Sequence, residues 1–192
     1  MGRTLVSRDP AARLAERQGW ITDGAQEAAQ TGIAETLEKI GGRRLREVLH
    51  GDWLHEPLHA AITDVPVGSW TAAVAFDAVA AISGSQAMDT AADACVGLGL
   101  LGAVAAAVTG MNDWAEVKEE APRRIGAVHA LLNVAATGLF VGSLVARRRG
   151  GGRGTGRALG VLGFVVASAS AHLGGNLVYE HGVGVEGRKE IL

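Results

Sequence analysis

The stretch ACVGLGLLGAVAAAVTGM, residues Ala94–Met111, decides the fold class because it contains no charged residue. A helix needs about 20 predominantly apolar residues to cross the hydrocarbon core of a bilayer. A helix on the surface of a soluble protein normally keeps one polar face, and this stretch has none. It therefore predicts a transmembrane helix.

Three further windows have a similar length and composition. The window from 125 to 146 contains a single titratable side chain, His129. The first window is the least apolar, because it includes Asp64 and Asp77. A soluble all-α bundle is the alternative, but several consecutive apolar runs without a polar face argue against it. The predicted spans are 60–82, 94–112, 125–146 and 158–179.

The predicted fold is all-α, a membrane four-helix bundle with up-down topology over residues 51–192. Short connections favour antiparallel neighbours. The 28 glycines and the many alanines suit close packing of helices, which lipid does not drive together by the hydrophobic effect. Both termini and the middle connection then share one side of the membrane, together with 13 of the 18 Lys and Arg residues. The positive-inside rule predicts cytoplasmic N and C termini, and we expect the protein in the plasma membrane.

Residues 1–50 are polar and predict an amphipathic helical arm. Asp9 and Pro10 match an N-cap followed by proline at the first helical position. Apolar residues then recur at roughly helical spacing from Ile33 to Val48, interrupted by Gly41-Gly42. Such a stripe predicts a helix lying on the bilayer interface or on a partner. The first 20 residues contain no uninterrupted apolar stretch, which predicts that there is no cleavable signal peptide.

Several classes of function find no support in the composition. The net charge of −2 gives no reason to expect nucleic acid as a partner. Cys95 is the only cysteine, so neither a disulfide framework nor a thiolate metal site is expected. The chain carries no catalytic motif, and we expect no enzyme activity from it alone. A glycine-interleaved group of arginines predicts a solvated loop near lipid headgroups: Arg147, Arg148, Arg149, Arg153 and Arg157.

The six histidines all fall at one membrane face under this topology. His129 shares a helix face with Asn133 and Thr137, and His172 is expected to share one with Ser168 and Asn176. Interhelical hydrogen bonding would explain each residue singly. Ionisable groups in spans are nevertheless candidates for function.

We expect the core of any cofactor site to consist of His59 and His129, whose helices are diagonal in an up-down bundle. Haem b with two axial histidines, a transition metal and a proton relay remain alternatives. A mixed shell for zinc or non-haem iron would draw on His59, Asp64, Asp113, His129 and His172. In the haem arrangement the carboxylates would orient the imidazoles.

Four ordered motifs carry a resemblance: LHGDWLHEPLHAAITDVPVGSW (49–70), TGMNDW (109–114), RRIGAVHALLN (123–133) and LGGNLVYEHGVGV (173–185). Together they resemble an uncharacterised bacterial family of four-span membrane proteins, a domain of unknown function. In some members this domain precedes a Rieske iron–sulfur domain. The resemblance implies a multi-pass membrane protein and a role beside electron transfer, with a Rieske-type or other redox protein as partner.

The chain departs from the family pattern at several positions. Glu56 stands where the first motif usually has histidine, Ala60 replaces a proline, and Asn176 occupies a position that is often histidine. His59 and His129 match the pattern. The functional hypothesis is a haem- or metal-binding component associated with membrane electron transfer, and the alternative is a non-catalytic membrane scaffold.

Overall fold

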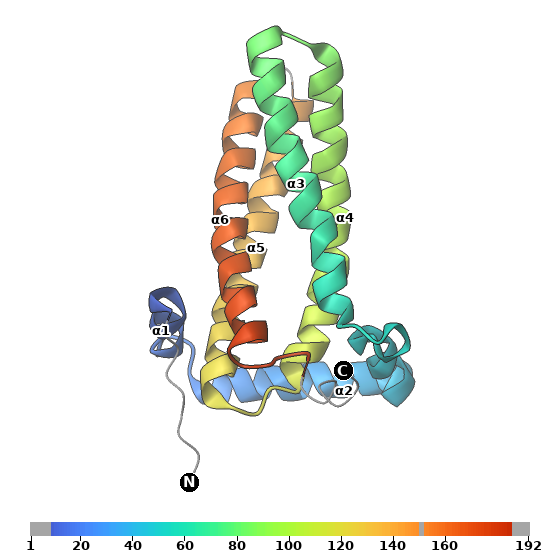
Figure 1. The fold of residues 1–192 in the computed structure, drawn as a ribbon, viewed down its shortest axis with the longest axis vertical. Helices are drawn as coiled ribbons and strands as arrows, with labels where there is room; N and C mark the ends of the chain where they lie inside the picture. Colours follow the sequence, from blue (N-terminus) through green and yellow to red (C-terminus); the bar gives the residue numbers. More distant parts are fainter. Residues whose placement is uncertain (1–8, 150–151, 186–192) are drawn as a thin grey trace. The chain divides into compact units, whose positions relative to one another are not determined.

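The computed structural model describes residues 9–149 and 152–185. Six α-helices and a short 3-10 helix follow in the order α1 (Pro10–Glu16), α2 (Asp23–His50), η1 (Asp52–Leu54), α3 (Leu58–Ser83), α4 (Gln86–Ala115), α5 (Glu120–Arg148) and α6 (Arg153–Tyr179) (Figure 1). Across the described residues no strand is present. The predicted all-α membrane bundle with an N-terminal helical arm is confirmed.

Each of the four predicted spans lies inside one long helix, from α3 to α6. All four helices are long and apolar enough to cross a membrane. Gly84 and Ser85 join α3 to α4, residues 116–119 join α4 to α5, and α6 begins five residues after α5 ends. Such short connections give antiparallel neighbours. Pro66 lies inside α3, which membrane helices tolerate because neighbouring groups satisfy the freed backbone.

The chain forms two compact units, which are described separately. Unit 1 comprises Met1–His59, Val108–Ala130 and Ser170–Leu192. Unit 2 comprises Ala60–Ala107 and Leu131–Ala169. Unit 1 therefore contains the arm and the α4–α5 connection, whereas unit 2 contains most of each long helix.

The core of unit 2 is built largely from small residues and one aromatic stack. Trp70 of α3 stacks on Phe140 of α5, with ring centroids 4.1 Å apart and planes 11° apart. Alanine and valine from all four long helices surround the stack: Ala73, Val96, Ala136 and Ala167. Gly99 of α4 lies against the indole, where a Cβ would come within 2.3 Å of the Trp70 Nε1 atom. Small residues thus permit the close helix approach that lipid-embedded packing requires.

The arm of unit 1 begins as its sequence predicts. Pro10 is the first residue of α1, and the Asp9 carboxylate accepts a hydrogen bond from the Ala11 amide (2.9 Å). Thr22 caps α2 in the same way through the Ala25 amide (3.2 Å). Gly42 adopts φ 59° and ψ −154° and kinks α2 at the predicted interruption. A positive φ is easily adopted only by glycine.

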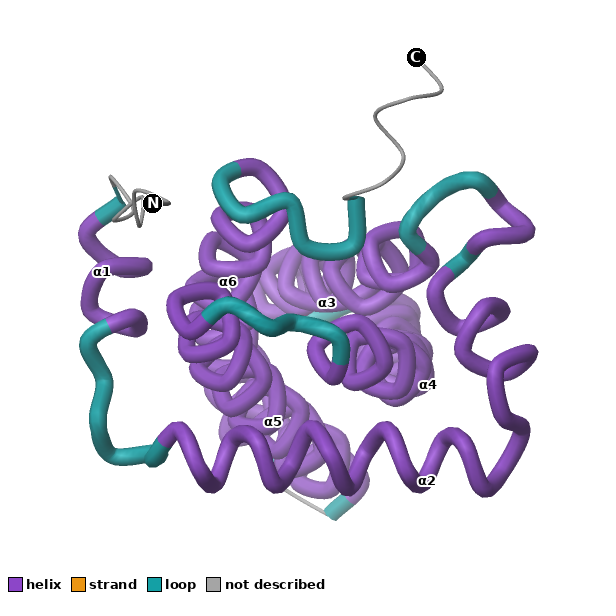
Figure 2. Tube along the Cα trace, turned by 90° about the horizontal axis from the view of Figure 1, so that it is seen from below, coloured by secondary structure: helices purple, strands orange, loops and turns teal. Residues whose placement is uncertain are grey.

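Helix α2 runs past the ends of α5 and α4 within unit 1 (Figure 2). The Gln30 side-chain amide donates to the carbonyls of Trp114 (2.7 Å) and Val117 (2.9 Å). The Trp114 indole donates to the Arg123 carbonyl (3.0 Å), which closes the turn between the two spans. Polar contacts therefore attach the arm to the α4–α5 connection, while Ile40 and Val48 of the predicted apolar stripe stay exposed.

Candidate functional site

His59 and His129 come together in unit 1. His59 is the second residue of α3, and His129 lies in the third turn of α5. Their ring centroids are 6.3 Å apart, and the ring planes are almost perpendicular at 88°. The predicted convergence of the two rings is confirmed, whereas their role in holding a cofactor stays a prediction.

The backbone of α6 fixes the orientation of the His129 ring. Its Nδ1 lies 2.8 Å from the Ser170 carbonyl oxygen, and the Ser170 hydroxyl donates to the His129 carbonyl (3.0 Å). A carbonyl oxygen can only accept, so Nδ1 must carry the proton. In the neutral ring Nε2 is then the acceptor, the atom with which such an imidazole binds a proton or a metal ion.

His59 is positioned by α4. Its Nδ1 lies 3.3 Å from the Thr109 hydroxyl oxygen. The next residue, Gly110, has no side chain, and a Cβ there would come within 2.7 Å of the His59 Cε1 atom. Gly174 of α6 likewise leaves room for His129, with 3.0 Å from a Cβ to the Cε1 atom. Each imidazole therefore packs directly against the backbone of a neighbouring helix.

Of the other three predicted metal ligands, Asp113 and His172 pair with other side chains and Asp64 is exposed. The Asp113 carboxylate lies 3.0 Å from the Nδ1 atom of His50, the last residue of α2. Asp64 belongs to unit 2, where its side chain is exposed. The His172 ring is 61% exposed and pairs with Asp9 of the arm at 2.5 Å. Within the described residues no three His, Cys, Asp or Glu side chains are grouped closely enough to hold a metal ion.

The expected inner face of α6 is correct at Asn176, which is buried, and wrong at Ser168 and His172. Ser168 is exposed and donates to the Phe164 carbonyl (2.8 Å), and His172 faces the arm. Other buried positions of α6 include Ser170, Leu173 and Leu177, which recur at i, i+3 and i+7. A helix with 3.6 residues per turn places Ser168 and Ser170 about 200° apart around its axis. Only one of these serines can therefore face the bundle.

Arginine–carboxylate pairs hold the arm to the two spans. Arg124 at the start of α5 binds both carboxylate oxygens of Asp23, at 2.9 and 2.7 Å. The hydrogen bond from Arg124 is the main reason why the pKa of Asp23 lies below its ordinary value. Arg123 pairs with Glu27 (2.9 Å), and Arg46 pairs with Glu116 (2.6 Å). These pairs lie along α2 and leave its orientation little freedom within unit 1.

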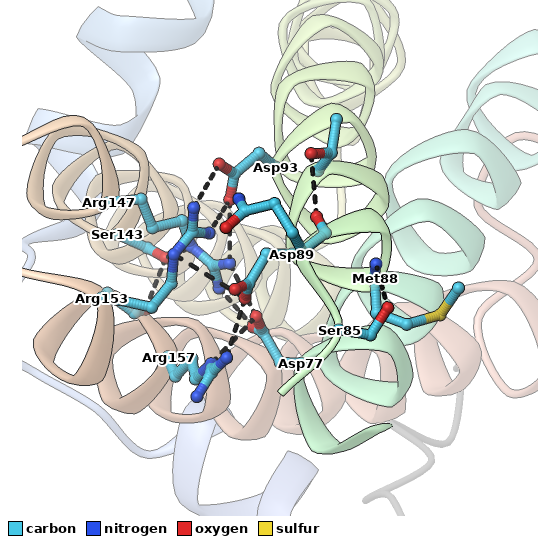
Figure 3. A network of polar contacts seen from close by, with 12 residues as sticks. Asp77, Ser85, Met88, Asp89, Asp93, Ser143, Arg147, Arg153 and Arg157 are labelled. Atoms are coloured by element: carbon cyan, nitrogen blue, oxygen red, sulfur yellow. Dashed lines mark hydrogen bonds and ion pairs between the residues drawn. The ribbon is translucent and has the colours of Figure 1, made fainter. Parts of the chain in front are cut away.

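The sequence also predicted a solvated arginine loop, and for three of its five arginines this is wrong. In unit 2, Arg147, Arg153 and Arg157 bind carboxylates of α3 and α4 (Figure 3). Arg148 and Arg149 are exposed, as expected. The sequence does contain one indication of this pairing. Three aspartates flank the α3–α4 connection, and their charges equal in number those of three arginines around the α5–α6 connection: Asp77, Asp89 and Asp93.

The comparisons with known proteins identify a family and no activity. A family model described as "Predicted membrane protein (DUF2231)" matches residues 55–187. No curated protein and no solved structure matches the chain. The matched region includes the four long helices and both convergent histidines. The chain therefore belongs to the DUF2231 family of predicted membrane proteins.

Proposed function

We propose that His59 and His129 bind one transition-metal ion between their Nε2 atoms, and that the protein is a metal-binding component of the membrane. The 6.3 Å between the ring centroids is the observation that carries this proposal. Imidazole nitrogens lie about 2 Å from a bound ion, and two rings facing each other across it would have centroids about 6 Å apart. Perpendicular ring planes are compatible with this arrangement.

The two imidazole donors suit a metal ion, and the close packing around them favours an ion over haem. Imidazoles suit zinc, copper, iron and nickel, and copper binds such ligands most strongly among the divalent ions. Haem would need a slot for the porphyrin around the axis that joins the two histidines. The backbones of α4 and α6 stand directly beside the rings, at Gly110 and Gly174. Cavities of about 570 and 370 Å³ lie along α2, and neither histidine lines them.

Metal analysis of the purified full-length protein tests the proposal. After chelation and reloading with copper or zinc, we expect about one ion per chain, with loss of most of it in His59→Ala and His129→Ala. His172→Ala is the matched control, because it removes an exposed imidazole that pairs with Asp9. Equal metal content in all four proteins would exclude the site. Membrane yield and thermal unfolding show whether each variant is folded.

A copper or iron ion would also suit the proposed role beside electron transfer, with a Rieske-type protein as partner. Support for this role comes from the family resemblance alone. A one-electron change in the absorption or paramagnetic resonance signal of the metal-loaded protein, lost in His129→Ala, is the expected result. A loaded site without redox activity would leave metal binding in place and remove the role in electron transfer.

A scaffold is the second candidate function, and the exposed aromatics of unit 1 favour it. Trp20 is 67% exposed, Trp53 is 61% exposed and Tyr179 is 89% exposed. Trp53 precedes the first residue of α3 by five positions, and Tyr179 is the last residue of α6. Tryptophan and tyrosine are enriched where spans meet the membrane–water interface. Quenching of Trp20 and Trp53 fluorescence by brominated lipid tests whether the arm lies on the bilayer.

For sidedness we propose a plasma-membrane location with cytoplasmic N and C termini, from the distribution of Lys and Arg. Reporter fusions at residue 1, between 150 and 156, and at residue 192 test it. Cytoplasmic activity is expected at both ends, with the opposite result in the α5–α6 connection.

A further inference from the structure

Six charged side chains of unit 2 divide between its two helical hairpins by sign. The α3–α4 hairpin supplies the acids Asp77, Asp89 and Asp93, and the α5–α6 hairpin supplies the bases Arg147, Arg153 and Arg157. Each of these helices is apolar enough to cross a membrane. Ionisable residues in such segments are costly unless they pair.

The centre of the group is Arg147, whose side chain is completely buried. One terminal nitrogen donates to Asp77 (2.7 Å) and to Asp93 (3.2 Å), and the other binds the second Asp77 oxygen. The remaining nitrogen, Nε, donates to the Ser143 hydroxyl (3.0 Å). All three nitrogens of this buried guanidinium are therefore engaged.

The other five charges surround Arg147 in the same alternation of sign (Figure 3). Arg153 binds both oxygens of Asp93, at 2.5 and 3.1 Å, and lies 3.7 Å from Asp89. Arg157 binds Asp89 at 2.7 Å and lies 3.7 Å from Asp77. Each acid thus contacts two arginines and each arginine contacts two acids. The six side chains form a closed, alternating and electrically neutral ring.

The backbone of α6 is shaped to admit Arg147. A Cβ at Gly156 would come within 2.5 Å of the Arg147 Cγ atom, and one at Gly160 within 3.3 Å of a terminal nitrogen. The Ser143 hydroxyl donates to the Gly156 carbonyl (2.6 Å), which holds α5 and α6 together at this level. The two helices of the second hairpin therefore present the arginines to the first as one surface.

We propose that this ring is the recognition surface through which the two hairpins select each other in the membrane. Each hairpin alone carries three like charges at the ring, and the buried Arg147 pairs with acids of the other hairpin, Asp77 and Asp93. Among the described residues, every ion pair of the ring joins one hairpin to the other. Removing one member of a buried ion pair leaves an uncompensated charge, whereas removing both members is far less costly.

A natural probe reports whether the hairpins are paired. Trp70 belongs to the α3–α4 hairpin and stacks on Phe140 of the α5–α6 hairpin. In full-length protein with Trp20, Trp53 and Trp114 replaced by phenylalanine, the Trp70 emission therefore follows hairpin association during heating in detergent. Arg147→Gln and Asp77→Asn should each lower the apparent Tm by roughly 10 °C.

The decisive comparison is the double variant Asp77→Asn/Arg147→Gln, which restores neutrality and should recover more than half of that loss. Arg148→Gln is the matched control, because the neighbouring arginine is exposed and outside the ring, and no shift is expected. Single variants without an effect, or a double variant that loses the sum of the two single shifts, would overturn the proposal. If the single variants fail to accumulate in the membrane, accumulation of the double variant supports the proposal and its absence overturns it.

Discussion

The two units differ in which kinds of side chain they bury and which they expose. In unit 2 the large exposed hydrophobics are all aliphatic within the described residues, such as Leu101 and Val134, while the charges of the ring turn inward. In unit 1 tryptophan and tyrosine are exposed, and ion pairs such as Arg46–Glu116 are partly exposed. Aliphatic surfaces suit lipid tails, and aromatic and charged surfaces suit the interface. From this difference we infer which part of each long helix meets hydrocarbon and which part meets water.

The largest loss of stability is expected from a substitution in the core of unit 2. Phe140→Ala removes the ring on which Trp70 stacks and should lower the free energy of unfolding by about 3 kcal/mol or more. Val134→Ala on the same helix changes a side chain that is mostly exposed to lipid, and we expect almost no effect. Thermal unfolding in detergent measures both. An equal loss of stability in both variants would contradict the assignment of the buried and exposed faces of α5.

A smaller effect tests the close packing of α4. Gly99→Ala places a Cβ against the rigid indole of Trp70 and should destabilise the protein by about 1–3 kcal/mol. The matched control is Gly97→Ala, because no atom lies within 4 Å of a Cβ there. This substitution should be neutral or slightly stabilising, since alanine favours helix over glycine. A control as harmful as Gly99→Ala would contradict the packing.

The ion pairs of the two units should differ in their sensitivity to salt. In 1 M NaCl the screening length falls to about 3 Å, so the partly exposed pairs Arg123–Glu27 and Arg46–Glu116 should weaken by up to about 1 kcal/mol each. The Arg147–Asp77 pair of unit 2, in which both side chains are almost completely buried, should respond much less. Emission from single-tryptophan proteins reads the arm through Trp20 and unit 2 through Trp70. A shift of the Trp70 transition as large as that of Trp20 would contradict the distinction.

The smallest effect is a pH dependence of the arm. Because Arg124 lowers the pKa of Asp23 in the folded protein, their pairing stabilises the arm fully above the ordinary value of 3.8. The contribution is lost as the pH falls below 3.8 towards the lowered pKa. Hydrogen exchange of α2 should therefore rise in this range, and Asp23→Asn should abolish that part of the change. The same acid response in both proteins would assign it to other carboxylates.

The parts of the fold that depend on residue type and spacing were predictable from the sequence. Apolar length gave the four spans, and Asp9-Pro10 gave the start of α1. His59 and His129 were expected to converge because each lies near the same end of its span. These predictions need no knowledge of how individual side chains turn.

Part of the inner face of α6 and the ionic ring were missed for a physical reason. Ser168 and Ser170 are two small polar residues in an apolar run, and nothing local decides which one faces His129. Arginine has a long side chain, so residues at the end of a span can reach inward as readily as outward. Arg147 turns inward because it pairs with Asp77 and fits into the space beside Gly156. Both residues belong to other helices.

Hydrogen–deuterium exchange of the full-length protein in lipid nanodiscs tests the central claim most directly, namely that the helix segments of unit 2 are embedded in lipid and that α1 and α2 of unit 1 are hydrated. We predict strong protection of amides in residues 66–82, 94–106, 132–146 and 158–168, and faster exchange throughout α1 and α2. Protection of the arm equal to that of these segments, or rapid exchange within them, would contradict the account.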